Sequence, residues 1–536
     1  MKRVVLASIL TAALSCAAQH HDHGPSQAHA TEKLGRVSFP TSCDPKVQAQ
    51  FERGVALLHS FWFPEGLKAF TAVAEQDPGC AMAYWGIAIN RLLNPFNGEA
   101  AATFVKEGQA AIEKAQALGA KTRRERDYIA AAALLYTDVG TRRWSERAVD
   151  YEKAMAQVVA QYPTDVEAKV FYALALNFAA DLSDQTYAKP LKAAQLLEPL
   201  LAAYPDHPGI AHFLIHSYDY PPLAEKGLAA ARRYAAIAPS AAHALHMPSH
   251  IFTRVGAWED SAETNRRSED TARSEPVGDE ALHAIDYQVY AYLQMARDED
   301  AKQAMERAEG YASRLKFVRP AGPFARAAVP ARYALERGDW KSAAQLPVEP
   351  TKVLYANAVT HFARALGAAR AGDPAAAQAD LARLDELRND LDKAGNAYWS
   401  GQVEIQWLAA SAWTHLRQGR RDVALELMRR AADKESASEK ASVSPGPILP
   451  ARELLGDMLL ELNEPALALK EYEAAQAREP NRFRGWYGAA VAAEKSGDGA
   501  KAITYYGKLA ALAQHGDSRP ELQEASRFLV KSGLRR

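Results

Sequence analysis

A pattern of glycine, alanine, aromatic and proline residues recurs along this chain at intervals of about 34 residues. Its two clearest copies follow one another directly, in residues 449–482 and in the residues from Phe483 onward. The first copy is marked by Gly456, Ala468, Tyr472, Ala475 and Pro480, and the second by Trp486, Ala490, Gly497, Ala502 and Tyr506. This spacing predicts two helices joined by a turn in each copy. Because one helical hairpin cannot bury its apolar face alone, consecutive copies must stack and share a continuous core.

Further copies of the pattern lie near the start of the chain. Residues 47–80 contain Gly54, Leu57, Phe70 and Pro78, and the next copy opens with Tyr84-Trp85-Gly86-Ile87-Ala88. Weaker copies lie around Gly372 and Gly419, whereas residues 100–200 match the pattern poorly. Helical repeats are therefore predicted for most of the chain, with their register uncertain in the poorly matching stretch.

Over most of residues 45–515 this pattern resembles the tetratricopeptide repeat superfamily. The resemblance implies an all-α fold, a right-handed α-solenoid of about ten antiparallel helix pairs. It also implies that the first helix of each repeat lines a concave groove, where such proteins bind a partner. The segments Leu58-His59-Ser60-Phe61-Trp62 and Leu245-His246-Met247-Pro248-Ser249-His250-Ile251 are similar to an exported bacterial branch of the superfamily. For that branch the resemblance implies a fold and no reaction.

The first 18 residues have the composition of an export signal. Met1-Lys2-Arg3 is a charged start, and Val4 to Ala13 is an apolar stretch too short to span a bilayer. Two cleavage sites are compatible with this segment: a lipoprotein-type cut that would lipidate Cys16, or an ordinary cut after Ala17 or Ala18. We therefore expect an exported bacterial protein, either periplasmic or anchored to the membrane as a lipoprotein.

Composition along the chain predicts five segments after the signal. Residues 19–40 are polar and His-rich and predict a flexible tether, and residues 41–433 form the main repeat block. Residues 434–450 are rich in Ser and Pro and predict a loop, followed by C-terminal repeats in 451–515 and a helix or tail in 516–536. The loop either separates the C-terminal repeats from the rest or is an insertion folded over the groove.

The charges of the chain are balanced, with 64 Lys and Arg against 65 Asp and Glu. This balance offers no electrostatic attraction for nucleic acid, and it leaves the possible lipid anchor as the expected contact with a membrane. The sequence has no phosphate-binding glycine loop, no nucleophile elbow, no His-Glu-x-x-His and no Cys-x-x-Cys. A groove that binds a protein or peptide is favoured over an enzyme.

Two cysteines remain beyond the signal, Cys43 and Cys80. An even number of cysteines in an oxidising compartment favours a disulfide. In the repeat register both lie at the same end of the first hairpin, which is compatible with a bridge. The alternative is a pair of unlinked buried thiols.

Five of the 15 histidines fall within the 39 residues from His212 to His250. The spacing is i,i+4 in His212 and His216, i,i+3 from His243 to His246, and i,i+4 again from His246 to His250. On a helix each of these intervals places the side chains on one face. Pro248 lies between the last two histidines and is expected to kink the helix and rotate His250 relative to His246.

The repeat register places these histidines at groove-facing positions. With units of 208–241 and 242 onward, His212 and His246 occupy equivalent positions on adjacent helices, as do His216 and His250. Since adjacent helices pack about 8–10 Å apart, these four side chains are predicted to form one four-cornered set. Other groove positions fall to His59, Asp219 and His243, and in the following unit to His283 and Asp286.

Three interpretations of the histidine cluster remain open. The first is a metal site with His212, His216, His246 and His250 as ligands, for which imidazole donors suit Zn or Cu. Orienting partners for the outer ring nitrogens are then expected among Asp219, Asp286 and Glu259. The second is a set of hydrogen-bonded groove histidines that bind a peptide or small polar ligand. The third is a metal-dependent enzyme that uses the same histidines, with Asp219 or Asp286 as a base.

The function predicted from the sequence is an exported repeat scaffold. Its groove binds a protein partner or small ligand, and its His-lined site holds a divalent metal. The alternatives are the metal-dependent enzyme and a scaffold for protein–protein contacts alone.

Overall fold

The computed structural model describes residues 32–275, 278–315 and 319–533, and the compact unit begins at Leu34. The predicted signal peptide, Cys16 and most of the predicted tether lie outside these residues. No helix in the described ranges is long and apolar enough to cross a membrane.

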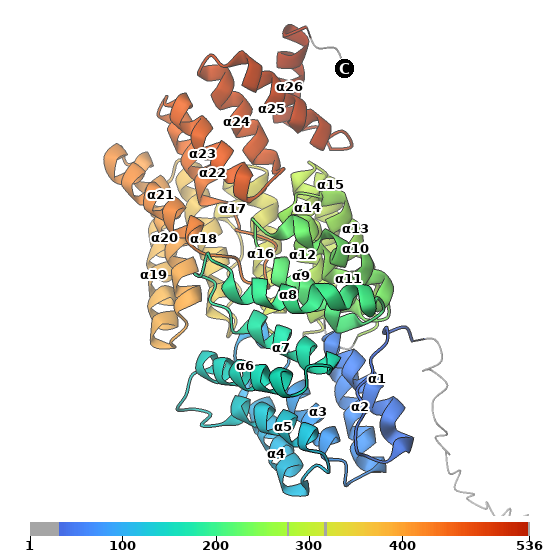
Figure 1. The fold of residues 1–536 in the computed structure, drawn as a ribbon. Helices are drawn as coiled ribbons and strands as arrows, with labels where there is room; N and C mark the ends of the chain where they lie inside the picture. Colours follow the sequence, from blue (N-terminus) through green and yellow to red (C-terminus); the bar gives the residue numbers. More distant parts are fainter. Residues whose placement is uncertain (1–31, 276–277, 316–318, 534–536) are drawn as a thin grey trace, which may run out of the picture. The chain divides into compact units, whose positions relative to one another are not determined.

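Consecutive helices of the compact unit pack as pairs (Figure 1). The first five pairs are α1 (Gln48–His59) with α2 (Phe63–Gln76), α3 (Ala81–Arg91) with α4 (Ala102–Leu118), α5 (Arg123–Ala133) with α6 (Trp144–Gln161), α7 (Val166–Phe178) with α8 (Ala188–Ala203), and α9 (Pro208–Tyr218) with α10 (Leu228–Ile237). Short 3₁₀ segments lie at Pro45–Val47, Pro95–Asn97, Leu134–Tyr136 and Ala224–Gly227.

Seven further pairs follow. They are α11 (Ala242–His246) and α12 (Pro248–Arg254) with α13 (Trp258–Ala272), α14 (Asp279–Gln294) with α15 (Asp298–Ala312), α16 (Ala321–Glu336) with α17 (Trp340–Ala344), α18 (Leu354–Arg370) with α19 (Ala377–Lys393), α20 (Ala397–Arg417) with α21 (Arg421–Ser436), α22 (Ala451–Glu461) with α23 (Pro465–Arg478), and α24 (Phe483–Lys495) with α25 (Gly499–Leu512). A last helix, α26 (Pro520–Lys531), packs against α25. The all-α solenoid of helix pairs is confirmed, and residues 100–200, where the repeat pattern is weak, also form helix pairs.

The repeat signature has the same packing role at both ends of the chain. A Cβ atom added to Gly86 of α3 would lie 2.3 Å from the Phe70 ring of α2, and one added to Gly488 of α24 would lie 2.2 Å from the Tyr472 ring of α23. Both distances are far below van der Waals contact, so the aromatic ring of one hairpin packs directly on the backbone of the next. This close approach explains why glycine and an aromatic residue recur together.

The predicted tether is too long at its C-terminal end. Phe39 is fully buried, with its ring 5.6 Å from that of Trp85 and 5.1 Å from that of Tyr128. The backbone N–H of Arg36 also donates to the carbonyl of Asp206 at 2.9 Å. Residues 34–40 therefore belong to the folded unit. The prediction used the polar composition of residues 19–40 as a whole, whereas burial of the Phe39 side chain stabilises the C-terminal end of this segment against the repeats.

The disulfide predicted between Cys43 and Cys80 is present, with the two Cα atoms 5.0 Å apart. It joins the segment before α1 to the start of α3 and so closes the first hairpin. A terminal repeat lacks one stacking neighbour, which makes a covalent link there especially stabilising.

Replacing both Cys43 and Cys80 by serine is expected to lower the free energy of unfolding of this hairpin by about 3–4 kcal/mol. The bridge spans a sequence separation of 37 residues. Closing a loop of that length lowers the conformational entropy of the unfolded chain, which raises the free energy of unfolding by about this amount. Urea unfolding followed by circular dichroism measures the change. A reducing agent should shift the wild-type curve toward that of the variant and leave the variant unchanged; equal shifts in both would contradict the prediction.

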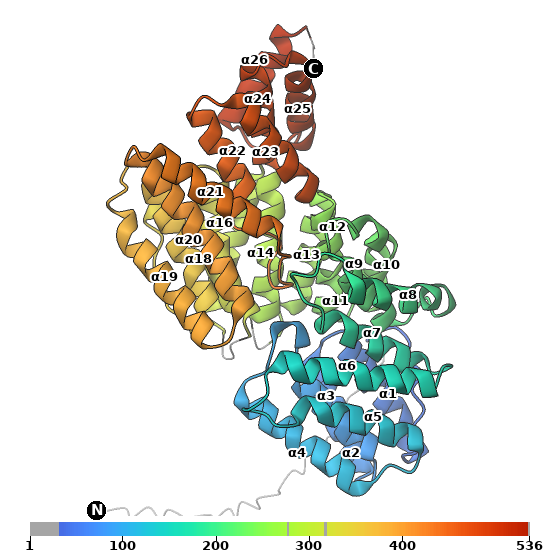
Figure 2. The ribbon, with the colours of Figure 1, turned by 60° about the vertical axis from the view of Figure 1, so that its left-hand side comes forward.

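The segment between α21 and α22, residues 437–450, is here called the strap. Its Glu439 N–H donates to the carbonyl of Leu182 at 3.0 Å, and its Ser444 carbonyl accepts from the Tyr287 hydroxyl of α14 at 3.2 Å. Arg332 of α16 donates to the carbonyl of Pro447 at 2.8 Å. Of the two alternatives for this loop, the structure has the insertion folded over other helices, and it runs beside α14 in both views (Figures 1 and 2).

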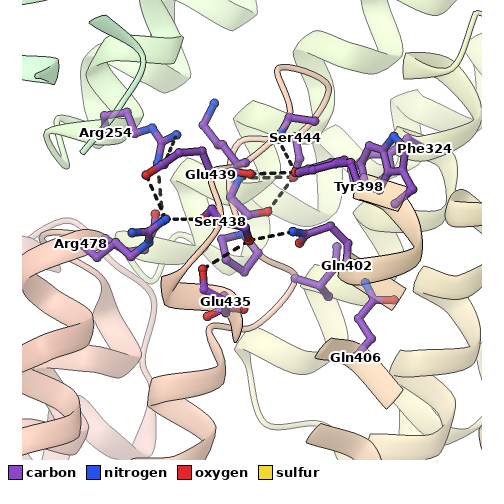
Figure 3. A pocket seen from close by; sticks show the side chains of 17 residues that line it. Arg254, Phe324, Tyr398, Gln402, Gln406, Glu435, Ser438, Glu439, Ser444 and Arg478 are labelled. Atoms are coloured by element: carbon purple, nitrogen blue, oxygen red, sulfur yellow. Dashed lines mark hydrogen bonds and ion pairs between the residues drawn. The ribbon is translucent and has the colours of Figure 1, made fainter. Parts of the chain in front are cut away.

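Charged and polar side chains hold the strap on its other side (Figure 3). Glu439 lies 3.5 Å from Arg254 and 3.2 Å from Arg478. The Tyr398 hydroxyl donates to the Glu439 carbonyl at 2.9 Å, and Gln402 donates to the Ser438 hydroxyl at 3.1 Å. The strap is thus bonded to α12, α20 and α23 as well as to α14 and α16, and it is part of the core.

Candidate metal centre

Six buried histidines gather in two groups of three on the helices α9, α11, α12 and α14. The first group, trio A, contains His212, His216 and His243, and the second, trio B, contains His246, His250 and His283. Within each trio one nitrogen from each ring lies within 4.8 Å of the others. None of the six residues is more than 7% exposed.

This grouping differs from the predicted four-cornered set of His212, His216, His246 and His250. His243 and His283, which were predicted as other groove residues, complete the two trios. The ring of His243 lies 5.2 Å from that of His212, and the ring of His283 lies 4.3 Å from that of His246. Both histidines of α11 are shared out in this way: the ring of His243 meets that of His212 on α9, and the ring of His246 meets that of His283 on α14.

Pro248 interrupts the helix without turning the two histidines apart. α11 ends at His246 and α12 begins at Pro248, but the intervening Met247 keeps helical angles of φ −53° and ψ −36°. The Nε2 atoms of His246 and His250 consequently lie 3.0 Å apart. The expected rotation of His250 is absent.

Two histidines of trio B have their Nδ1 atoms held by acceptors, whereas Nδ1 of His283 is buried without a hydrogen-bond partner among the described residues. Nδ1 of His246 lies 2.6 Å from Oδ1 of Asn265, whose amide nitrogen donates to the Ser261 carbonyl at 2.7 Å. Nδ1 of His250 lies 2.8 Å from Oδ2 of Asp219. Since an amide oxygen and a carboxylate oxygen accept hydrogen bonds, both Nδ1 atoms must carry the N–H that donates to them. Each Nε2 therefore carries a lone pair.

Two lone pairs that face each other at 3.0 Å in a buried site repel. The Tyr287 hydroxyl, 3.4 Å from Nε2 of His250, can satisfy only that nitrogen, whereas a positive charge between the two nitrogens satisfies both. A proton is a poor candidate for that charge. Burial lowers the pKa of His250 to about 4 and that of His283 to about 3, and it lowers the pKa of His246 well below the usual 6.5. At neutral pH the three imidazoles are neutral donors that can coordinate a cation.

Asp219 links trio B to the strap. Its carboxylate accepts from Arg254 at 2.9 Å and from the strap's Lys440 at 2.8 Å, in addition to His250. Burial would raise the pKa of Asp219, but Lys440, Arg254 and His250 together hold it well below its usual value. The carboxylate stays charged and fixes the ring of His250, as predicted for an orienting partner of a ligand.

Trio A has a similar outer set of acceptors. Nδ1 of His212 lies 2.6 Å from the backbone carbonyl of His59, and Nδ1 of His243 lies 3.4 Å from Oε2 of Glu280. Nε2 of His243 is buried without a hydrogen-bond partner among the described residues. Nε2 of His216 lies 3.2 Å from that of His212. Here too the inner nitrogens face one another.

Aromatic rings enclose the trio A imidazoles. The ring of Phe96 stacks on His216 with centroids 4.0 Å apart, and that of Phe61 stacks on His243 at 5.3 Å. These contacts hold the imidazole planes and keep water from their faces.

His59, predicted as a groove residue, belongs to a separate buried group. Its Nε2 and that of His207 each lie 2.8 Å from one oxygen of Glu167. Burial would raise the pKa of Glu167, but the two histidines lower it to about 2. Both imidazoles are already hydrogen-bonded to the carboxylate, so this group needs no ion. His207 and Glu167 were missed in the sequence because Glu167 lies in the stretch of uncertain register and His207 precedes the unit that begins at residue 208.

Two of the three predicted orienting partners are wrong. Asp286 is fully buried against Arg332, with Oδ1 2.8 Å from its Nε, and Glu259 is 73% exposed and pairs with Arg297. Among the described residues both carboxylates hydrogen-bond to arginines rather than to a histidine of the trios. Asn265 and Glu280 take these roles instead, because α13 and α14 pack against α11 on the sides where its outer nitrogens lie.

One cavity borders both trios. Two rings from each trio line it, together with apolar side chains, amides, two carboxylates, one cation and part of the strap: His216, His243, His250, His283, Phe61, Phe63, Met247, Ala321, Asn94, Asn97, Asp279, Glu280, Arg319, Ser442 and Val443. The inner faces of the imidazoles are therefore reachable by small molecules and covered from a larger one by the strap.

The helix pairs and their packing give this chain the all-α solenoid fold that its resemblance to tetratricopeptide repeats implies. Among solved structures it is similar to a dimer of human IFIT1 with m7Gppp-AAAA, at 12% identity and a TM-score of 0.36, over 80% of this chain and 90% of that one. It is also similar to a tetratricopeptide repeat protein from Parabacteroides merdae, at 11% identity and a TM-score of 0.30, over 55% of this chain and 99% of that one. No known family and no curated protein matches the sequence.

Proposed function

We propose that this protein is an exported repeat scaffold that binds a divalent transition-metal ion through trio B. The observation that carries the proposal is the pair of Nε2 lone pairs of His246 and His250 at 3.0 Å, fixed from outside by Asn265 and Asp219. An ion bound at about 2.0–2.1 Å from two imidazole nitrogens holds them roughly 3.0–3.4 Å apart. His283 supplies a third donor, and three imidazoles suit Zn or Cu.

The geometry supports a metal over a peptide as the occupant of this site. A peptide in a groove needs exposed side chains to contact, whereas the histidines of trio B are at most 7% exposed and lie under the strap. Any protein partner is therefore expected to bind elsewhere on the scaffold. Export itself is tested by mass spectrometry of the mature N-terminus, which distinguishes a lipidated Cys16 from a free end after Ala17 or Ala18.

Metal binding is tested with protein purified without a histidine tag and stripped with a chelator. After incubation with Cu²⁺ or Zn²⁺ and desalting, elemental analysis is expected to find metal in the wild type. Replacing both His246 and His250 by Gln is expected to abolish binding at trio B. A matched control is His361→Gln, since His361 also pairs with a carboxylate but lies on α18, outside the centre. The proposal fails if the wild type binds no metal or if the double variant binds as the wild type does.

Asn265→Leu is expected to weaken metal binding by about 10–100-fold without removing a ligand. The substitution removes the acceptor that holds the His246 ring and its tautomer. Competition with a chromogenic chelator measures the affinity. Affinity equal to that of the wild type would show that the outer hydrogen bond does not prepare the site.

A further inference from the structure

We infer that trio A is a second metal site and that the two trios form one dinuclear centre opening on a shared cavity, where a small anion bridges the ions. The inference rests on the proposed function of trio B and extends it to a second ion and a ligand class.

The donors of trio A support a site of its own. The carbonyl of His59 accepts at 2.6 Å, so Nδ1 of His212 is protonated and its Nε2 carries a lone pair. The carboxylate of Glu280 does the same for His243, whose buried Nε2 has no hydrogen-bond partner among the described residues. A buried acceptor without a partner is costly, and an ion between His212, His216 and His243 would satisfy it.

The two trios lie too close together to be independent sites. Ring centroids of His216 and His250 are 6.0 Å apart, and those of His243 and His246 are 5.8 Å apart. Rings at these distances are direct neighbours, so ions on their inner nitrogens share one buried volume. Two-ion centres in proteins hold their ions roughly 3.5–4 Å apart, usually with a ligand between them.

The shared cavity indicates what that ligand is. It is bordered by His216 and His243 of trio A and by His250 and His283 of trio B, so open positions of both ions would face the same space. Three imidazoles leave an ion with one or two such positions. The strap residues Ser442 and Val443 line the cavity, and Arg319 lies there paired with Glu280 at 2.9 Å and Asp279 at 4.0 Å. Because these side-chain charges offset one another, the two ions themselves would attract and hold a small oxygen or nitrogen anion, such as hydroxide or azide.

Copper is the ion that this donor set favours. All six ligands are imidazoles, with no thiolate and no carboxylate among the inner donors. Imidazole binds Cu²⁺ more tightly than Zn²⁺ in the ordinary order of divalent affinities. The group of His59, Glu167 and His207 adds no third ion, since its imidazoles already donate to the carboxylate.

The experiment loads the stripped full-length protein with Cu²⁺ and combines native mass spectrometry with spin-counted electron paramagnetic resonance. The wild type is expected to bind two ions, with a spin intensity well below two per chain because bridged Cu²⁺ ions couple. Replacing both His216 and His243 by Asn should leave one ion with the full intensity of an isolated Cu²⁺. The matched double replacement of His246 and His250 by Asn should leave the other ion. Azide should change the wild-type optical spectrum at one equivalent per ion pair.

The possible results separate the two proposals. A wild type with one ion that is lost only in the trio B variant overturns the second site and leaves the proposed function intact. A wild type without metal overturns the proposed function. Two ions with the full intensity of two isolated spins overturn the shared centre. The wild-type measurements need no variant, so they decide the question even if a double variant fails to fold.

Discussion

Replacing Arg482 by methionine is expected to lower the free energy of unfolding by about 3–5 kcal/mol, because it leaves buried carboxylates without their cation. Arg482 is fully buried at the start of α24. Its guanidinium lies 2.7 Å from Glu453 of α22 and 2.7 Å from Glu336 of α16, and it donates to the Tyr290 hydroxyl of α14 at 2.6 Å. Burial alone would lower the pKa of Arg482, but the two carboxylates raise it.

Because of the position of Arg482, the loss of stability in this variant tests how the C-terminal helix pairs are joined to the helix pairs that precede the strap. Its partners on α14 and α16 precede the strap in the sequence, and its partner on α22 follows the strap. The variant should therefore weaken the packing of α22 to α25 on α14 and α16. Thermal or urea unfolding followed by circular dichroism measures the loss. The matched control is Arg266→Met, because Arg266 and Glu263 form an ion pair that is about half exposed at 49% and 54%. Exposed pairs contribute less than about 1 kcal/mol, so equal effects of the two replacements would contradict the expectation.

Acidification is expected to unfold the metal-free protein steeply below pH 6.5. Burial lowers the pKa of six histidines below the value of 6.5 that they have in the unfolded chain: His59, His212, His216, His246, His250 and His283. Below pH 6.5 the unfolded chain binds protons at these positions and the folded protein does not. Each group then costs about 1.4 kcal/mol of stability per pH unit until its folded-state pKa is reached, about 4 for His250 and about 3 for His283.

The acid transition is measured by circular dichroism in the presence of a chelator, from pH 8 downward. His283→Asn should make the transition less steep, since it removes one of the proton-binding groups. His515→Asn is the control, because His515 is exposed near the C-terminus. A transition whose steepness is the same in all three proteins would show that the buried histidines do not govern acid stability. Bound metal should move the transition to lower pH, since protons must first displace it.

Much of the fold was predictable because its packing rule is local. Gly54, Gly86, Gly456 and Gly488 all face the aromatic ring of a neighbouring helix, and their spacing recurs in the sequence. In residues 100–200 the same type of contact exists, as where Gly108 faces Tyr136, but the two residues do not stand at the repeat spacing. A search by spacing therefore misses those pairs, although the helices pack in the same way.

The site was predictable only in part, for a related reason. Helical spacing and repeat register identified His212, His216, His246 and His250 as neighbours. The division into trios depends on packing, which brings His243 of α11 to a ring of α9 and His246 to a ring of α14. Asn265 and Glu280 were missed because their contacts with the outer nitrogens depend on side-chain directions across three helices.

The sequence by itself determined the helix pairs and the face of each helix that carries the histidines, because these follow from contacts between residues at a regular spacing. The tertiary structure alone decided which imidazoles meet, which acceptors set their protons, and that the strap covers them. Such contacts join Asp219 to Lys440 and Tyr287 to Ser444, residues more than 150 positions apart. No periodic signal in the chain connects residues at such separations, and only their packing brings them together.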